Sequence, residues 1–542
     1  MYISIKENKE KFVFLFFALL FFIGLTIFRD YGIALDEDNS RINGFVSLKY
    51  IFQIFLPDKI HLINEIIEVP NISMHTEKGI GVIFDLPMAF VEYIFKIEDP
   101  RTFYLVRHFF NFLIFYISTY FFYLIVKKRF NSYFMGLIGA SFLIISPRIF
   151  AESFYNSKDL VFLSLFIISI YYAIKFLEIP NLKNLIFFCL TSAISIDLRI
   201  LAIFFPLLVF FLYFIKNLRD KKIKKNFFKN SILFTVLLPT FIIIFWPYLW
   251  DDPFHKFFNV IENFNYFESR IYNLYLGKFV SAEALPWHYP IIWQLVTIPL
   301  LYLILFVFGF CIILSRIIKR ILKIEKNDSY KDLWRGEREL QDILFFFSYI
   351  IPLFVVINFN SSLYDGWRHL YFIYPSFLMV SMFFLNYVRI KYLKKIKYKF
   401  YIIPVVLILP ILYWMIKNHP HQNVYFNLIA GKKFNTLFET DYWGLSNYQS
   451  LNYIFKNNKT KTTVAKIGTT DLMLSRNFLT QDAKDKIEII SNFNEADYII
   501  TNYRDWNGKI KDFKSLVPQN YEIYYQILVS NIPINTVYKK KD

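Results

Sequence analysis

The chain has 542 residues, of which 56% are hydrophobic and 21% aromatic, and its formal net charge is +18. A soluble protein is usually about 45–50% apolar, so this composition indicates a membrane protein. Its basic residues fall in short loops between apolar runs and not on one face of a soluble fold, which argues against nucleic-acid binding. Cys189 and Cys311 both lie inside apolar runs, so the cysteines predict neither a disulfide nor a metal framework.

Eleven apolar runs predict transmembrane helices, because about 20 such residues cross the hydrocarbon core of a bilayer. They lie at 12–29, 104–126, 132–147, 159–177, 183–197, 200–216, 230–249, 290–314, 341–358, 368–388 and 400–416. The first run follows three lysines and continues into "RDYGIALDEDN" without a small-residue cleavage site. We therefore expect an uncleaved anchor and not a signal peptide.

The distribution of Lys and Arg predicts the orientation of these helices. With the N-terminus inside, the basic clusters at 127–129, 175–183, 216–229, 316–338 and 389–399 all fall on the inner side. This is the bias that orients membrane proteins. Two long loops (30–103 and 250–289), a short loop (359–367) and the tail (417–542) are then external. Long loops in a compact protein are usually functional.

Two parts of the external side have predictable structure. Residues 42–56 and 79–95 are apolar with interspersed polar residues, and we expect helices at the membrane interface. The tail contains short alternating stretches at 462–468, 486–491 and 497–503 and a helical pattern at 446–456, which predict a small α/β domain. The expected domains are a membrane domain, 1–416, and an extracytoplasmic domain, 417–542.

The acidic segment "YGIALDEDNSR" after the first span is the sharpest candidate for chemistry. It carries Asp36, Glu37 and Asp38. A carboxylate at the membrane surface can act as a general base toward an acceptor hydroxyl or amine, and burial would raise its pKa into a useful range. The alternative is that these residues only cap a helix, with Asp38 or Asn39 at the N-cap.

Further ionisable residues fall on the same predicted side of the membrane. They occur in "HTEKG" (His75, Glu77, Lys78), in "SPRIFAESFYNSKD" (Arg148, Glu152, Lys158, Asp159), as Arg107-His108 and Asp197-Arg199, and in "LYDGWRHLYFIYP" (Tyr364, Asp365, Arg368, His369). Charges at the membrane edge are costly and tend to be functional. Each group also has a structural alternative: the arginines snorkel to the headgroups, the histidines are local hydrogen-bond partners, and Asp197-Arg199 is a structural pair.

The order of these motifs resembles the GT-C superfamily of polyprenyl-phosphate-sugar glycosyltransferases, which includes protein O-mannosyltransferases and the lipid A aminoarabinose transferase. Asp36-Glu37 matches the family's acidic pair in the first external loop. Glu77-Lys78 opens "EKGIGVIFDLP", which lacks the two prolines of the family's "K-P-P-L"-like stretch. Arg107 and Asp159 match an arginine and an acid at later helix ends. Residues 363–375, 419–434 and 438–446 resemble a bacterial subgroup of the family.

The resemblance implies an all-α polytopic membrane protein of the GT-C type, with about 11 transmembrane helices and a small C-terminal α/β extracytoplasmic domain. It implies an inverting transfer of a sugar from a polyprenyl-phosphate carrier to a lipid, glycan or protein acceptor outside a bacterial plasma membrane. The implied catalytic residues are Asp36, Glu37 and Asp159. The implied donor-phosphate ligands are Lys78, Arg107, Arg199, Arg368 and His369, and the implied acceptor or sugar ligands are Glu77, Glu152, Tyr364 and Asp365.

Other functions remain open at this stage. Some members of the family use a divalent metal, and the sequence shows no metal-ligand cluster that decides the point. A transporter or flippase of lipid-linked saccharide is the main alternative, although its charges would gather at the bilayer midplane and not at one face. A non-catalytic membrane scaffold is the other, but it leaves the acidic pair and the Arg/His loop unexplained.

Overall fold

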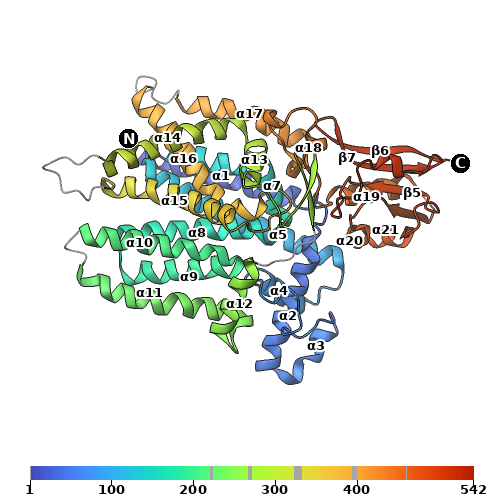
Figure 1. Cartoon of the computed structure of the whole chain (residues 1–542), viewed down its shortest axis with the longest axis horizontal. Coiled ribbons are helices and arrows are strands. Elements are labelled where there is room, and N and C mark those ends of the chain that lie inside the picture. The colour runs from blue at the N-terminus through green and yellow to red at the C-terminus, as the bar shows by residue number, and fades with distance from the viewer. Residues whose placement is uncertain are drawn as a thin grey trace.

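The structure is a computed structural model and describes residues 2–219, 224–265, 271–322, 333–392, 400–458 and 460–541. Long helices run across the view in Figure 1, and a small sheet lies at one end of them. The helices of the first external loop, α2, α3 and α4, lie at this same end of the bundle (Figure 1). The C-terminal sheet therefore lies at the same end of the bundle as the segment that follows α1.

Eight helices in the described residues are long and apolar enough to cross a membrane, and a bent pair brings the number to nine. The eight spans lie within α1 (Tyr2–Ile27), α5 (Pro100–Phe130), α8 (Asp159–Glu178), η2 (Ile200–Ile203) with α10 (Phe204–Arg219), α11 (Lys224–Phe245), α14 (Leu300–Leu322), α15 (Gly336–Asn358) and η4 (Arg368–Ile373) with α16 (Tyr374–Lys391). The chain is therefore a multi-pass membrane protein by helix length and composition.

Every predicted span forms a helix, but four of the eleven differ from a simple crossing. The span predicted at 132–147 corresponds to α6 (Tyr133–Ile144), which forms a bent pair with α7 (Pro147–Tyr155) at 70°. Helices α9 (Leu182–Leu198) and α17 (Ile402–Lys417) are apolar but have only 17 and 16 residues. The run at 290–314 breaks into α13 (Tyr289–Thr297) and α14, because Pro299 separates them. The basic loops at 216–229, 316–338 and 389–399 lie partly outside the described residues.

Glycines allow close contacts inside the helix bundle. Gly136 and Gly139 of α6 pack on Tyr123 and Val126 of α5, where a Cβ atom would come within 2.8 Å of either side chain. Such small residues let membrane helices approach one another. At the bundle end away from the sheet, α5 ends in a basic turn, and its Arg129 makes a bidentate pair with Asp342 of α15 at 2.8 and 2.7 Å.

The first external loop folds as two packed helices and not as a span. Helix α2 (Asp36–Phe55) packs along α4 (Asp85–Phe95), and η1 (Pro57–Lys59) and α3 (His61–Asn64) join them. The predicted interfacial helices are confirmed as helices, and α4 is too short to cross a bilayer.

The second external loop contains structure that the sequence analysis did not predict. After η3 (Pro247–Leu249), helix α12 (Pro253–Asn265) leads to a hairpin of β1 (Tyr272–Tyr275) and β2 (Lys278–Ser281). The two turn residues Leu276 and Gly277 have φ values of 50° and 79°, which is the conformation that two-residue hairpins require.

The tail begins with short turns, η6 (Gln422–Val424), η7 (Leu428–Ala430) and α18 (Phe434–Leu437), followed by α19 (Ser446–Asn457). Its five-stranded sheet has the order β4-β3-β5-β7-β6, formed by β3 (Thr462–Lys466), β4 (Ile487–Ile489), β5 (Tyr498–Thr501), β6 (Tyr521–Val529) and β7 (Ile532–Lys540). Strands β4, β3 and β5 are parallel, and the β6–β7 hairpin adds antiparallel to β5. Two short helices, α20 (Leu472–Asn477) and α21 (Gln481–Lys486), complete this α/β unit, which confirms the predicted fold class.

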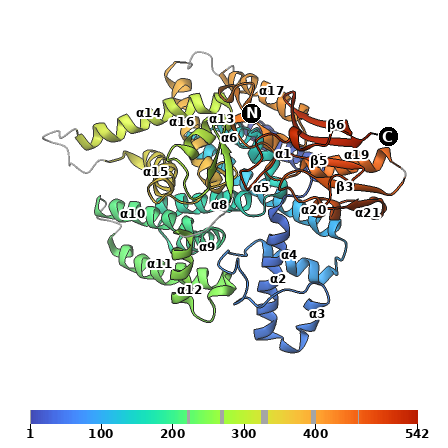
Figure 2. The ribbon, with the colours of Figure 1, turned by 45° about the vertical axis from the view of Figure 1, so that its right-hand side comes forward.

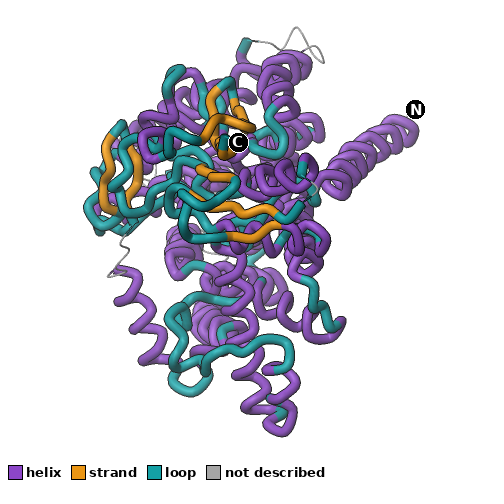
Figure 3. Tube along the Cα trace, turned by 90° about the vertical axis from the view of Figure 1, so that its right-hand side faces the viewer, coloured by secondary structure: helices purple, strands orange, loops and turns teal. Residues whose placement is uncertain are grey.

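The sheet unit packs near the start of α5, and Figures 2 and 3 show the sheet and the helices from two further directions. A small apolar cluster joins Ile33, Phe103 and Tyr104 to Leu474 and Phe478 of the tail. Helix α19 also lies against the first loop, since a Cβ atom on Gly32 would come within 2.4 Å of the Leu445 carbonyl. The beginning and the end of the chain therefore share one interface above the helix ends.

Candidate active site

Asp36 is the first residue of α2 and pairs with Arg368. Its helix has three acidic residues in the first turn, where the partial positive charge of the helix N-terminus stabilises them. The Asp36 side chain is 36% exposed, whereas its ionic neighbours Asp159 and Arg368 are each only 1% exposed. Asp36 is therefore the carboxylate of this group that an incoming molecule can reach.

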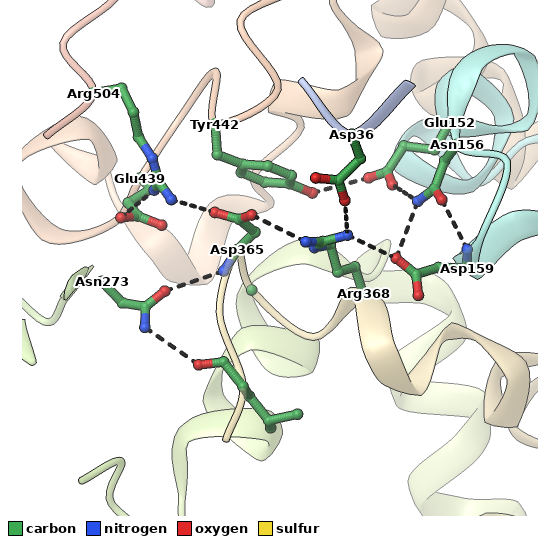
Figure 4. Close-up of polar contacts among 12 residues, drawn as sticks. Asp36, Glu152, Asn156, Asp159, Asn273, Asp365, Arg368, Glu439, Tyr442 and Arg504 are labelled. Carbon is green, nitrogen blue, oxygen red and sulfur yellow. Dashed lines mark hydrogen bonds and ion pairs between the residues drawn. The ribbon is translucent and has the colours of Figure 1, made fainter. Parts of the chain in front are cut away.

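Arg368 connects three carboxylates from distant parts of the chain (Figure 4). Its Nη1 donates to Asp36 Oδ2 at 2.9 Å and to Asp159 Oδ2 at 3.0 Å, and its Nη2 lies 3.4 Å from Asp365 Oδ2. The turn before it places Asp365 and Gly366 in the left-handed region, with φ values of 58° and 79°. Asp and Gly tolerate this region better than other residues, which explains the "YDG" sequence before η4.

Asp159 and Arg199 extend the same cluster. Asp159 opens α8, and its backbone N–H donates to the side-chain oxygen of Asn156 at 2.8 Å, which fixes the start of the helix. Arg199 ends α9, where a cation is favourable, and its Nη2 donates to Asp159 Oδ1 at 2.6 Å. The structural pair predicted between Asp197 and Arg199 is wrong, because Arg199 turns to Asp159.

Asp197 has a different role in the structure. Its Oδ2 accepts the backbone N–H of Ile83 at 2.9 Å. Its carbonyl oxygen lies so close to Gly81 that a Cβ atom there would stand 1.6 Å away. Asp197 therefore anchors the segment before α4 to the end of α9, and Gly81 is required by this close approach.

Lys158, and not Lys78, supplies the ammonium group of the cluster. Lys158 Nζ donates to Glu77 Oε2 at 3.2 Å, and the amide of Asn43 donates to the same oxygen at 2.8 Å. Burial lowers the pKa of Lys158, but Glu77 and Asp36 outweigh it and the pKa rises above its usual value. Lys78 points away and donates to the Ser73 carbonyl at 2.7 Å.

The electrostatic state of Asp36 differs from the sequence expectation. Burial raises the pKa of Asp36, but the nearby Arg368 and Lys158 outweigh it, so the pKa lies below its usual value. The expected rise is thus wrong for this arrangement, because two cations face the carboxylate. Burial likewise raises the pKa of Glu77, and Lys158 and Asn43 bring it below its usual value.

Two further predicted residues lie beside the cluster with partners of their own. Glu37 is buried, accepts the Ala34 N–H at 2.8 Å and faces His108 Nε2 at 3.0 Å. Arg107 is buried against Asp85, with which it makes an ion pair. Neither of them contacts Asp36, so their catalytic and phosphate-binding assignments stay predictions.

Glu152 lies deeper than the predicted acceptor site. Its Oε1 accepts the hydroxyls of Tyr371 and Tyr442 at 2.8 and 2.9 Å, and its Oε2 accepts the amide of Asn156 at 2.8 Å (Figure 4). Since Asn156 also caps α8, Glu152 connects α7 to the residue that positions Asp159. This arrangement favours a supporting role for Glu152.

Aromatic rings cover the guanidinium of Arg368. Its carbon Cζ stands 4.7 Å from the ring centroid of Tyr364 and 4.6 Å from that of Trp443. The ring of His369 packs edge-on against Tyr364 at 4.7 Å. The two rings and the ionic partners together hold the guanidinium of Arg368 in place.

The carboxylates of the cluster face cations and not one another. Among the described residues, no group of three or more His, Cys, Asp and Glu side chains is placed to hold a metal ion. With Lys158, Arg199 and Arg368 together, the cluster presents cationic groups of the kind that bind a phosphate.

Four residues of the site were not among the predicted site residues. They are Lys158, Glu439, Tyr442 and Arg504. Lys158 was in a noted motif, and Glu439 and Tyr442 lie in the "FETDYWGLS" segment that carried the resemblance. Nothing in the local sequence of Arg504 marks it, because its role arises only from the way the tail packs on the bundle.

Comparisons with known proteins bear on the middle of the chain. Residues 90–250 match the family described as dolichyl-phosphate-mannose-protein mannosyltransferase. Among solved structures, ArnT from Cupriavidus metallidurans bound to undecaprenyl phosphate is similar at 10% identity and a TM-score of 0.45, covering 97% of this chain and 98% of that one. A search of curated proteins finds no match.

The matched segment supplies a large share of the cluster. It contains Glu152, Lys158, Asp159 and Arg199, which come from α7, α8 and α9 and the turn between them. The match over residues 90–250 therefore agrees with the resemblance that the sequence motifs show.

Proposed function

We propose that this protein transfers a sugar from a polyprenyl-phosphate carrier to an acceptor on the outer face of a bacterial plasma membrane, with inversion at the anomeric carbon. The observation that carries the proposal is the cluster itself: a reachable carboxylate, Asp36, is held beside Lys158, Arg199 and Arg368 at one end of the helix bundle. The family match of residues 90–250 supports the reaction class and the polyprenyl-type donor.

In the proposed reaction Asp36 is the general base. The acceptor hydroxyl or amine attacks the anomeric carbon from the side opposite the phosphate, and Asp36 takes its proton. The carbon–oxygen bond to the phosphate breaks, and the oxygen leaves with both electrons as polyprenyl phosphate. The new bond therefore forms on the opposite face of the sugar ring.

The cations of the cluster would hold the phosphate leaving group. A developing anion is stabilised by fixed positive partners that need no rearrangement. Arg199 and Arg368 are guanidinium groups at helix ends, suited to phosphate oxygens, and Lys158 adds a compact charge. We propose Lys158 for the part that the sequence assigned to Lys78, since Lys78 is turned to a backbone carbonyl.

Donor binding would also prepare Asp36 for its role. In the structure, Arg368 and Lys158 lower the pKa of Asp36 and so make it a weak base. A bound phosphate shares the charge of both cations, so less of it compensates Asp36 and the pKa of that carboxyl rises. The base then becomes effective only when the donor is in place.

The acceptor or sugar would meet the more exposed residues of the cluster. Glu77 is 29% exposed, and Tyr364 is half-buried at the edge of the site. Asp365 and Glu152 are occupied by protein donors, so we assign them to holding the site and not to the acceptor. The proposed orientation has the N-terminus in the cytoplasm and the tail outside, in agreement with the distribution of basic residues.

The test is an Asp36→Asn variant compared with the wild-type protein in cells that lack the native copy. Mass spectrometry of envelope glycoconjugates is expected to show a sugar addition that depends on the wild-type protein and is lost in Asp36→Asn. Removal of a general base slows transfer by roughly 10²–10⁴-fold. The matched control is Asp38→Asn in the same helical turn, because Asp38 accepts the Tyr104 hydroxyl at 2.9 Å and does not touch Arg368.

The same experiment separates the alternative functions. A flippase would move lipid-linked sugar across the membrane without a new covalent product. A scaffold would be unaffected by Asp36→Asn at equal membrane abundance. Either result, or equal loss in Asp36→Asn and Asp38→Asn, would contradict the proposed chemistry.

A further inference from the structure

Arg504 reaches from the sheet unit into the membrane domain. It lies just after β5, and its backbone carbonyl accepts the Thr469 N–H at 2.9 Å, which fixes the loop on the tail. The side chain is only 3% exposed. It makes ion pairs with Glu439 and with Asp365 of the turn before Arg368 (Figure 4).

Asp365 is thereby shared between two guanidinium groups. Its Oδ1 accepts from Arg504, and its Oδ2 faces Arg368 Nη2 at 3.4 Å. The backbone of the turn is also held, since the Asp365 N–H donates to Asn273 Oδ1 at 3.1 Å and the Gly366 N–H donates to the Tyr289 hydroxyl at 3.2 Å. Opposite charges thus alternate without interruption from the tail to Asp36.

We infer that Arg504 is a positioning residue of the active site, which holds Asp365 back so that Arg368 stays on Asp36 and Asp159. This inference rests on the proposed function. It gives the C-terminal domain a part in the reaction that no catalytic motif in the tail would reveal.

The physical reason is competition for the guanidinium of Arg368. Asp365 is buried, and a buried carboxylate requires cationic partners. With Arg504 present, one oxygen of Asp365 is satisfied by the tail and the contact to Arg368 stays long, at 3.4 Å. Without Arg504, Arg368 becomes the nearest cation that can satisfy Asp365, and the pair would shorten at the expense of the bonds to Asp36 and Asp159.

The protonation of Asp365 agrees with this competition. Burial raises the pKa of Asp365, and Arg504 and Arg368 only partly oppose it, so the pKa stays above its usual value. Loss of Arg504 raises it further. A proton on Asp365 would end its pull on Arg368, so the defect of an Arg504 variant should be smaller at acidic pH.

Docking of the tail does not depend on Arg504. Arg101 of α5 donates to the Tyr448 hydroxyl at 3.2 Å and to the Phe478 carbonyl at 3.3 Å. Lys484 pairs with Asp99 at 3.4 Å, and the apolar cluster around Phe478 covers the same contact. Arg504 can therefore be changed while the interface keeps its other contacts.

The experiment compares Arg504→Gln with two control variants in the full-length protein. Arg476→Gln tests the fold of the tail, because Arg476 donates to the backbone carbonyls of Ile487 and Lys484 in its own domain, at 2.6 and 2.5 Å. Arg101→Gln tests the docking contact. Transfer is followed by the mass-spectrometric product of the wild-type protein over a range of pH, and binding of undecaprenyl phosphate is followed by native mass spectrometry.

The expected result is a loss of transfer by roughly 10- to 100-fold in Arg504→Gln, the range that misplacement of a catalytic group produces. Arg504→Lys should keep most of the activity, and both control variants should stay near the wild-type rate. Adding Asp365→Asn to Arg504→Gln should restore transfer to within about tenfold of wild type, because it removes the carboxylate that competes for Arg368, and only Glu439 is left without its Arg504 partner.

Each outcome decides the inference. Equal activity of Arg504→Gln and Arg476→Gln would overturn the positioning role, and so would a double variant no more active than Arg504→Gln. If Arg504→Gln, Arg504→Lys and the double variant were all absent from the membrane, Arg504 would be structural and the inference wrong. A wild-type protein that neither binds undecaprenyl phosphate nor forms product would instead refute the proposed function.

Discussion

Replacement of Arg368 by methionine tests the ion pairs that Arg368 makes with Asp36, Asp159 and Asp365. Methionine replaces the apolar stem of the side chain but removes the guanidinium that lies over the Tyr364 and Trp443 rings. Three carboxylates, Asp36, Asp159 and Asp365, then lose a common partner. We expect the variant to be less stable and inactive.

The magnitude follows from the geometry. Breaking a buried ion pair by removing one partner costs about 3–5 kcal/mol. Asp159 keeps Arg199 and Asp365 keeps Arg504, so their residual cost is small. Asp36 is partly exposed and is screened by water. We therefore expect a loss near the lower end of the range, about 3 kcal/mol.

The pH dependence has a definite sign. In the folded wild-type protein the pKa of Asp36 is depressed, so its contribution to stability is present above its ordinary pKa and is lost as the pH falls through the folded-state value. Arg368→Met removes much of that contribution. The stability gap between wild type and variant should therefore be widest at neutral pH and should narrow in acid.

Reversible unfolding in mixed micelles, followed by tryptophan fluorescence, measures the effect, since the chain has nine tryptophans. Titrations at neutral pH and at about pH 2, well below the ordinary Asp pKa of about 3.9, give the two free energies of unfolding. A variant as stable as wild type at neutral pH, or a gap that grows in acid, would refute the reasoning. Addition of Asp36→Asn should then cost less in the Arg368→Met background than in wild type.

Two other predictions concern the cation that serves the phosphate and the far end of the bundle. Lys158→Met should weaken binding of undecaprenyl phosphate by about tenfold or more in native mass spectrometry, because it removes a buried cation. Lys78→Met should change this binding by less than about threefold, since Lys78 donates to a backbone carbonyl. Equal effects of the two variants would contradict the assignment of phosphate binding to Lys158. Arg129→Met should destabilise the protein by about 3 kcal/mol through loss of its buried pair, without changing the product formed per folded molecule. Asp342 keeps Arg316 at 3.0 Å as its remaining cation, so the second change Asp342→Asn should restore only part of the stability, and an Arg129→Met variant of wild-type stability would contradict the prediction.

The sequence predicted the elements that depend on local pattern. Apolar runs placed the membrane helices of the described residues, and the alternation at 462–468, 486–491 and 497–503 placed three strands of the tail. A break inside a predicted span was missed where the run stayed apolar across a turn, as at Pro299. The β1–β2 hairpin was missed because it is short and its strands are stabilised by packing and not by pattern.

The sequence predicted many residues of the candidate site but not the contacts between them. The motifs pointed to Asp36, Asp159, Arg199 and Arg368, which do meet. The sequence could not predict which ion-pair partner each residue has, because this depends on the rotation of the helices and on how distant segments pack. Arg504 shows the same limit most clearly, because 139 residues separate it from Asp365.

The place of β7 in the sheet has a consequence for biogenesis. Although β7 is the last strand, it lies between β5 and β6 and pairs with both. The loop that carries Arg504 follows β5, so it gains its support only after residues 532–540 have emerged from the translocation machinery. During synthesis the proposed site would thus be completed in one late step, and nascent chains already inserted in the bilayer would lack it until then.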